Sequence, residues 1–340
     1  MGPNDSAEAV YMICFVVLGA PLNLFVFWRL SCRPPSQKRE LLLRILNVSD
    51  LWITVIYIPV QLLWKATQNW YYGITVCKLM AFSNVFGFYL SSNIIAAVAM
   101  EKLIVHVYSK DTNRNKLQLK LILITIALAA ICSAPQLVIW DTAERVIEGE
   151  EHTVCMDRWY LNRLFSNGTV LAKYTGPVSY YFFHLACVFW IPALTVTVCY
   201  AQIFLHVKRR VSSCQLNNQL AENDANRAEA ADAVSQSTER FLIRKYRRIK
   251  KRAFRLSFLL ILVYVLCWAP YNVISLWGLI SGSAPGASMA RSFYLLILLN
   301  SIVNPFIYGD STLIRSGGRD LRSTILDNPE NSNGQTLHHF

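Results

Sequence analysis

Long apolar stretches separated by polar segments dominate this sequence, and seven of them are long enough to cross a lipid bilayer. A helix needs about 20 mostly apolar residues to span a hydrocarbon core roughly 30 Å thick. The stretches are rich in Leu, Ile, Val and Ala and lack the alternation of barrel strands, so each is expected to be a helix. They lie near residues 10–30, 41–64, 77–107, 117–139, 177–207, 253–280 and 288–309. The pattern predicts an all-α membrane protein, a seven-transmembrane helix bundle.

Basic residues orient the predicted bundle. Of 340 residues, 54% are hydrophobic and 16% are charged, a balance typical of membrane proteins. Most of the 33 Lys and Arg residues lie in the loops after spans one, three and five or in the tail after span seven. Such loops stay in the cytoplasm, so the N-terminus is expected outside and the C-terminus is expected to be cytoplasmic. The net charge of +12 then indicates topology and contact with membrane lipids, not nucleic-acid binding.

Composition divides the chain into three regions. Residues 1–9 are expected to be a short extracellular tail, residues 10–312 the membrane domain, and residues 313–340 a cytoplasmic tail. Within the domain, residues 211–239 are polar and poor in aromatic residues, which predicts a disordered cytoplasmic loop. The basic stretch 240–255 then either meets anionic lipid headgroups or an acidic partner, or simply carries solvated charge.

Two of the nine cysteines are expected on the outer side of the membrane. Cys77 lies at the start of span three, and Cys155 lies in the outer loop of about residues 140–176. In an oxidising compartment this pair favours a disulfide over two free thiols. Asn4 and Asn167 lie in glycosylation sequons on the same side, which agrees with the predicted topology.

Polar residues and prolines in the middle of the spans carry the functional signal. An ionised Asp50 at mid-span is costly unless neighbouring groups satisfy it. Pro192, Pro270 and Pro305 each remove a helical hydrogen bond and are expected to bend their spans. Other polar residues lie at the depth of Asp50, where they form either an ion pocket or a purely structural network: Asn23, Ser91, Asn300 and Asn304.

The ordered set of motifs resembles a rhodopsin-like G-protein-coupled receptor over roughly residues 15–312. LNVSD contains Asp50, CWAP contains Trp268, and NPFIY ends at Tyr308, each in the span where such receptors carry it. Within the family, the resemblance is to the gonadotropin-releasing hormone and adipokinetic hormone receptors, relatives of the vasopressin group. The segments that carry it are SAPQLVIW, WIPALTVTVCYAQIF, CWAPYNV and NPFIYG.

This resemblance implies a multi-pass plasma-membrane receptor for a neuropeptide hormone that activates a heterotrimeric G protein, of the Gq class. It also implies that the polar cluster around Asp50 holds a sodium ion in the inactive state, and no other metal or cofactor is expected. In the family, span six pivots at the position of Pro270, with Trp268 beneath the ligand. Tyr200 and Tyr308 are expected to meet through water in the active state.

The resemblance places the ligand contacts on three spans. Asn84 stands where an amine receptor would carry a carboxylate, so amine binding is disfavoured. The outer loop allows a hairpin that turns at Glu148 and Gly149, and its acidic residues either attract a basic peptide or are solvated charge. The expected ligand-binding residues are Gln61, Lys65, Asn84, Trp268 and Tyr271.

One departure from the family bears on signalling. Where the family carries Asp-Arg at the cytoplasmic end of span three, this chain carries Glu101 and Lys102. Lysine lacks the planar fork with which arginine bonds several partners at once, so weakened coupling or a looser resting state is expected. The alternative function is therefore a receptor-like protein with weak G-protein coupling or a different small ligand. Enzyme classes are disfavoured because H-E-x-x-H, C-x-x-C and G-x-S-x-G are absent from the sequence.

Overall fold

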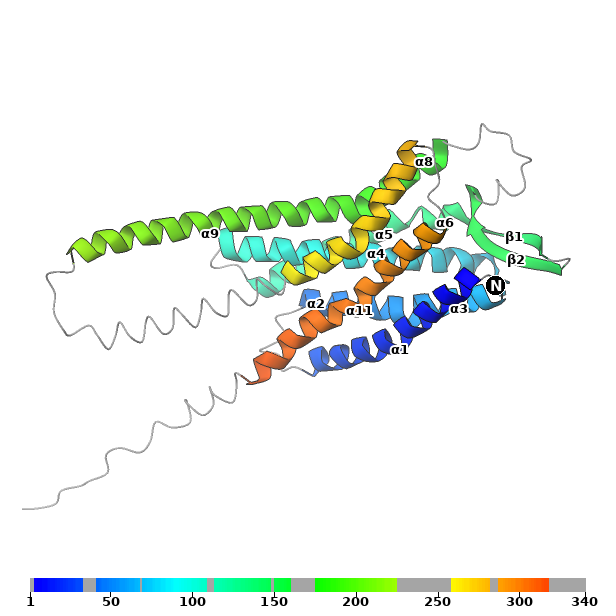
Figure 1. Ribbon diagram of the computed structural model, residues 1–340, viewed down its shortest axis with the longest axis horizontal. Helices are drawn as coiled ribbons and strands as arrows, with labels where there is room; N and C mark the ends of the chain where they lie inside the picture. The colour runs from blue at the N-terminus through cyan, green and yellow to red at the C-terminus, as the bar shows by residue number, and fades with distance from the viewer. Residues whose placement is uncertain are drawn as a thin grey trace, which may run out of the picture.

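The computed structural model describes residues 3–32, 41–67, 69–108, 113–147, 150–159, 175–224, 258–281 and 287–317. Within these residues, six helical segments are long and apolar enough to cross a membrane, and Ser292–Ile307 forms a shorter apolar segment. The helices run lengthwise in an elongated bundle, with the N-terminus and a β-hairpin at one end and the far ends of α9 and α11 at the other (Figure 1). The predicted all-helical bundle is confirmed, with a hairpin added on the outer side.

The elements follow the order of the predicted spans, and several spans contain a π-helical turn, labelled η. The first four spans are α1 (Pro3–Ser31); α2 (Leu41–Trp52), η2 (Ile53–Tyr57) and α3 (Ile58–Thr67); α4 (Gly73–Leu103) and η3 (Ile104–Tyr108); and α5 (Arg114–Ser133) with the short α6 (Gln136–Ile139). The last three are α8 (Thr175–Leu185), η5 (Ala186–Trp190) and α9 (Ile191–Asp224); the helix Phe258–Ser281; and α11 (Ala287–Gly317). The hairpin consists of β1 (Trp140–Ile147) and β2 (Glu150–Asp157).

The core of the bundle is centred on α4, which contacts α2, α5 and α9. Its side chains Tyr89, Ile94 and Ala97 are completely buried. The opposite situation holds on the outer faces of the helices, where large apolar residues such as Ile131 and Trp277 are 68% and 70% exposed. Apolar side chains on the outside of a bundle are favourable only where the surrounding solvent is also apolar, which agrees with a lipid environment.

Two of the π-helical turns end two residues before a proline. A proline cannot donate to the carbonyl four residues earlier, and its ring presses against that carbonyl. A π turn widens the helix at this point and relieves the contact. The turn η2 precedes Pro59, and η5 precedes Pro192. The bend expected at Pro192 therefore takes the form of a π turn, whereas Pro305 lies inside the continuous helix α11.

At two predicted boundaries the helices extend further than expected. Helix α1 begins at Pro3, so most of the expected tail 1–9 extends span one. Helix α9 continues to Asp224, so the first half of the expected disordered loop 211–239 is helical; Gln, Leu, Ala and Glu in this part are good helix formers. Residues 225–257 lie outside the described residues, as does the cytoplasmic tail beyond Gly317.

Candidate functional site

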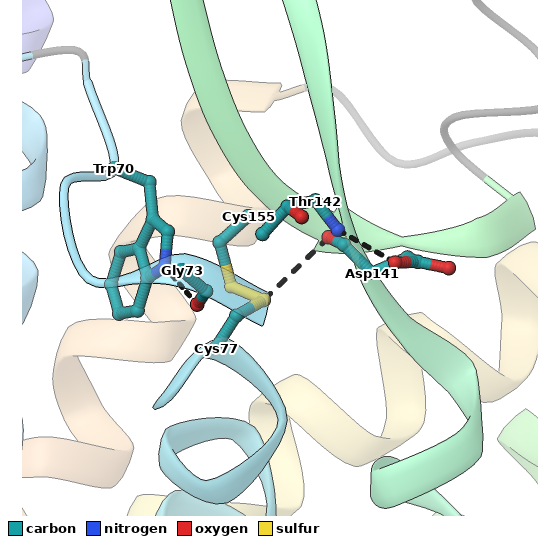
Figure 2. The surroundings of a disulfide bond; sticks show 6 residues. All are labelled: Trp70, Gly73, Cys77, Asp141, Thr142 and Cys155. Carbon is teal, nitrogen blue, oxygen red and sulfur yellow. Dashed lines mark hydrogen bonds between the residues drawn. A yellow bond between two sulfur atoms is a disulfide. The ribbon is translucent and has the colours of Figure 1, made fainter. Parts of the chain in front are cut away.

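A disulfide fixes the outer end of the bundle. Cys77 in the first turns of α4 is joined to Cys155 in β2, as the sequence predicted (Figure 2). The two cysteines pack with Trp70, whose indole nitrogen donates to the Gly73 carbonyl at 2.9 Å. Because 78 residues separate the cysteines, the cross-link restricts the unfolded chain and stabilises the fold by about 4 kcal/mol.

The hairpin is held over this outer end by further hydrogen bonds. Its strands are antiparallel and pair Ile147 with Glu150, which agrees with the hairpin that the sequence allowed; residues 148–149 lie outside the described residues. The backbone N–H of Trp70 donates to the Thr153 carbonyl at 2.7 Å, and the Thr153 N–H donates to the Asn69 side chain at 2.9 Å. These two hydrogen bonds therefore join β2 to the connection between α3 and α4. Of the sequons, Asn4 lies in the first turn of α1, and Asn167 lies outside the described residues.

Lys65, an expected ligand contact, has a charged partner that the sequence analysis missed. Its ammonium lies 2.8 Å from the carboxylate of Glu8 in α1, and the two side chains are 28% and 5% exposed. One helical turn before Lys65, Gln61 is half-buried on α3. On the same side of the bundle, the hydroxyls of Tyr57 and Tyr294 form a hydrogen bond that joins η2 to α11. Glu8, Lys65, Tyr57 and Tyr294 form a polar cluster on this side of the bundle. Its only signal in the sequence was an acidic residue, Glu8, near the start of an apolar span.

A series of aromatic contacts leads from this cluster into the core. The ring of Phe88 lies edge-on to Tyr57 at 5.5 Å and edge-on to Trp268 at 5.7 Å between centroids. The ring of Trp268 in turn lies 6.1 Å from that of Tyr264. Tyr271 packs against the same core. Edge-to-face aromatic pairs at these separations are favourable and rigid.

Two of the expected ligand contacts have a buried polar atom without a hydrogen-bond partner among the described residues. These atoms are Oδ1 of Asn84 and Nε1 of Trp268. Asn84 lies one turn before Phe88 on the face of α4 that contacts Trp268. A buried polar atom left without a partner costs about 1–3 kcal/mol, so this part of the bundle is suited to receive polar groups from a ligand or water.

The polar cluster at mid-membrane assembles around Asp50, which is fully buried. Asn304 of α11 donates to both carboxylate oxygens of Asp50, at 3.2 and 3.4 Å. Asn47 of α2 donates to Asn23 Oδ1 at 2.9 Å. Three further oxygens are buried without a hydrogen-bond partner in the described part of the chain: Ser91 Oγ, Asn300 Oδ1 and Asn304 Oδ1. An oxygen-rich set next to a buried carboxylate has the donor chemistry of a cation site.

Side chains replace the hydrogen bonds that two prolines remove. Pro305 leaves the carbonyl of Ser301 without its helical donor, and Asn23 of α1 donates to that carbonyl at 3.1 Å. Likewise Pro192 cannot donate to the Val188 carbonyl, which accepts from the hydroxyl of the fully buried Tyr264 at 2.9 Å. Asn23 was predicted to lie in this region, whereas Tyr264 was missed.

At the cytoplasmic end, Glu101 is buried and bonded to α5. It accepts from the guanidinium of Arg114 and, at 2.7 Å, from the amide of Gln118. The ammonium of Lys102 lies 3.5 Å from its second carboxylate oxygen. Arg114 and Gln118 were not identified from the sequence, because no motif marks them. Tyr200 packs against the main core, and the side chain of Tyr308 lies outside the described residues, so their expected meeting remains a prediction.

Comparison with known proteins agrees with this architecture. Residues 22–308 match the model of the 7 transmembrane receptor (rhodopsin family). The chain is 27% identical to the G-protein coupled receptor daf-38 of Caenorhabditis elegans, over 90% of this chain and 88% of that protein. It is 25% identical to the gonadotropin-releasing hormone II receptor of Chlorocebus aethiops, over 96% and 80%, and 23% identical to the mesotocin receptor of Rhinella marina, over 77% and 62%.

These findings place the chain in the plasma membrane as a multi-pass receptor. Receptors of this family are not enzymes, so the enzyme alternatives no longer apply. The family match covers most of the chain and agrees with the order of its apolar helices. The protein therefore belongs to the rhodopsin family of seven-transmembrane receptors.

Proposed function

We propose that this receptor binds an extracellular peptide hormone of the gonadotropin-releasing or adipokinetic hormone type and activates a heterotrimeric G protein of the Gq class. The names of similar proteins, which include receptors for gonadotropin-releasing hormone and mesotocin, support the ligand class. The observation that carries the proposal is the pair of unsatisfied polar atoms on Asn84 and Trp268, below an outer end that a disulfide keeps fixed. Because Asn84 is uncharged, this site favours the amide groups of a peptide over an amine.

The residues around the proposed site suit a peptide. The Glu8–Lys65 pair offers both signs of charge, and the hydroxyls of Tyr57 and Tyr294 offer neutral polar groups. Peptides present backbone donors and acceptors together with side chains of several kinds, so they bind best to a surface of mixed polar and aromatic character. A small amine would use only a fraction of these groups.

The contacts suggest how the effect of ligand binding is transmitted toward the cytoplasmic side. A ligand that displaces Phe88 or Trp268 alters the packing of Tyr264, because these rings are in contact in series. Tyr264 also holds the Val188 carbonyl at the π turn η5. A shift of the helix Phe258–Ser281 therefore has to break or rebuild this bond, which gives the receptor two distinct packings between which a ligand can select.

A sodium ion is part of the proposal. Asp50, with Ser91, Asn300 and Asn304, would hold it, since these residues combine a buried carboxylate with unsatisfied oxygens. When bound, the ion would supply a positive charge next to the buried carboxylate. The residues themselves connect α2 to α11 through the Asn304–Asp50 hydrogen bonds, so their arrangement depends on how these two helices pack.

Calcium release in cells expressing the chain tests the proposal. The panel comprises adipokinetic-like, gonadotropin-releasing-like and vasopressin-like peptides, and one class is expected to give a saturable response. Asn84→Ala is expected to weaken that response, while the matched control Ser83→Ala leaves it unchanged, because the Ser83 hydroxyl already bonds its own helix at 3.1 Å. Silence across the panel, with surface expression confirmed, would refute the ligand class.

Weak G-protein coupling is the second candidate, and the position of Lys102 favours it. At 3.5 Å from Glu101 the ammonium is beyond ordinary hydrogen-bond length and has no planar fork. If a peptide binds but calcium release is small, Lys102→Arg is expected to increase the response without changing peptide affinity. A response that stays small in Lys102→Arg would exclude this explanation.

A further inference from the structure

The carboxylate of Glu101 is bound mainly by α5 rather than by the residue next to it in sequence. Glu101 lies in the last turn of α4, and its side chain is 3% exposed. Arg114 is the first residue of α5, and Gln118 follows one turn later on the same face. Both donate to the same carboxylate oxygen, Oε1. Among the described residues, Arg114 is therefore the only one whose planar guanidinium reaches Glu101.

The start of α5 explains why Arg114 needs this anion. A helix N-terminus carries a partial positive charge, so cations in the first turn are unfavourable there. The first turn of α5 contains Arg114 and Lys116 and no acidic residue. Asn113 caps the helix by accepting from the Lys116 N–H at 3.2 Å, but its side chain is neutral. Glu101 supplies the negative charge that the first turn of α5 lacks.

The same arrangement includes α2. The side-chain oxygen of Gln118 accepts from the backbone N–H of Leu41, the first residue of α2, at 3.3 Å, while its nitrogen donates to Glu101. Gln118 is almost completely buried. One buried amide thus joins the cytoplasmic ends of α2 and α4, and Arg114 fixes the carboxylate between them. We name Glu101, Arg114 and Gln118 the cytoplasmic clamp.

Lys102 contributes positive charge to the cytoplasmic clamp but does little to fix the position of the carboxylate. Its ammonium approaches the other carboxylate oxygen, Oε2, at 3.5 Å and is 17% exposed. Because this distance exceeds that of an ordinary hydrogen bond, the interaction is a charge attraction that water and salt can screen. Arg114, by contrast, makes a direct charge-assisted hydrogen bond from its guanidinium.

We propose that Arg114, thirteen residues beyond Glu101, is the positioning residue that holds this carboxylate in the resting receptor. When the bond between Arg114 and Glu101 breaks, the cytoplasmic end of α4 separates from α5. The signalling consequence rests on the proposed G-protein function, whereas the structural restraint does not. Loss of the restraint frees η3 and the end of α4 from α5 and raises activity in the absence of ligand.

Amide hydrogen exchange on the full-length receptor in lipid nanodiscs tests the restraint directly. In Arg114→Ala, exchange across residues 98–108 is expected to accelerate by about 5-fold or more, the effect of a coupling energy at the lower end of the usual range. Lys116→Ala is the matched control, since it removes an exposed cation from the same turn, and its exchange is expected to equal that of the wild type. Unchanged exchange in Arg114→Ala would overturn the proposal.

A second variant separates the clamp from a general effect on α5. In a Glu101→Gln background, the carboxylate charge is already lost, so Arg114→Ala is expected to add less than 2-fold to the exchange rate, about the ratio expected for an uncoupled pair. An equally large acceleration in both backgrounds would show that Arg114 does not act through Glu101, and the proposal would fail.

Basal nucleotide exchange on purified Gq, measured with the same samples, tests the signalling consequence. An increase in Arg114→Ala but not in Lys116→Ala supports it. If the wild type responds to ligand and Arg114→Ala leaves basal nucleotide exchange unchanged, the signalling consequence is refuted. If amide exchange rises while no variant activates Gq with or without peptide, the restraint stands and the proposed function fails.

Discussion

The bond between Asn23 and the Ser301 carbonyl makes a quantitative prediction about Pro305. Asn23→Ala removes the side chain that replaces the missing helical donor, and it leaves a buried carbonyl unsatisfied. Hydrogen bonds between membrane helices are worth about 0.6 kcal/mol on average and about 1.7 kcal/mol at most. Asn23→Ala is expected to lie at the upper end, because Asn47 also loses the shorter of its two hydrogen bonds to Asn23.

Pro305→Ala is expected to reduce this cost. Alanine at position 305 supplies an N–H that donates to Ser301 within the continuous helix α11, so the carbonyl no longer depends on Asn23. In the double variant the cost of Asn23→Ala should fall by about 0.6–1.7 kcal/mol, which is the coupling energy of the cycle. Reversible unfolding of the purified receptor in mixed micelles measures all four free energies of unfolding.

A crossed pair provides the control for this cycle. Pro192→Ala alters a different helix and a carbonyl that Tyr264 satisfies, so it shares no partner with Asn23. Asn23→Ala and Pro192→Ala should therefore be additive within about 0.5 kcal/mol. Additivity of Asn23→Ala with Pro305→Ala would refute the reasoning, since it would mean that Asn23 does not compensate for the proline.

Three other predictions concern the outer end and the polar core. Replacing Glu8 with Gln leaves Lys65 without its carboxylate and should lower the free energy of unfolding by about 1 kcal/mol, and the exchange of both charges should recover part of it; a loss that the exchange does not reduce would contradict a direct pair. Asp50→Asn should abolish any increase in melting temperature on replacing choline chloride with sodium chloride, and a persistent increase would exclude Asp50 as the sodium ligand. Cys77→Ser should destabilise the receptor by about 2–5 kcal/mol in thermal melts and reduce surface expression, and stability equal to that of the wild type would show that the bond to Cys155 is dispensable.

The sequence was sufficient for features that depend on composition and local rules. The lengths of the apolar stretches predicted the spans, because the bilayer sets a minimum helix length. The pairing of Cys77 with Cys155 followed from topology, since only these two cysteines were expected outside. The contact of Asp50 with Asn304 was anticipated because a buried carboxylate requires polar neighbours at its own depth.

Features that depend on contacts between helices could not be predicted in the same way. The rule for prolines identifies the carbonyl that loses its donor, but only packing decides that Tyr264 replaces the donor for Val188. The partner of Lys65 is in α1, in a segment that composition assigned to a tail. The Arg114–Glu101 bond crosses the loop between two spans, and neither its residue types nor its spacing follows a local period.

The most direct test of the whole account is nucleotide exchange on purified Gq by the purified receptor, measured with and without the peptide that gives the strongest calcium response. The account predicts that the peptide accelerates exchange in a saturable manner and that Asn84→Ala shifts the response to higher peptide concentration. Specific binding of the peptide without any acceleration of nucleotide exchange would contradict the claim that this bundle is a signalling receptor.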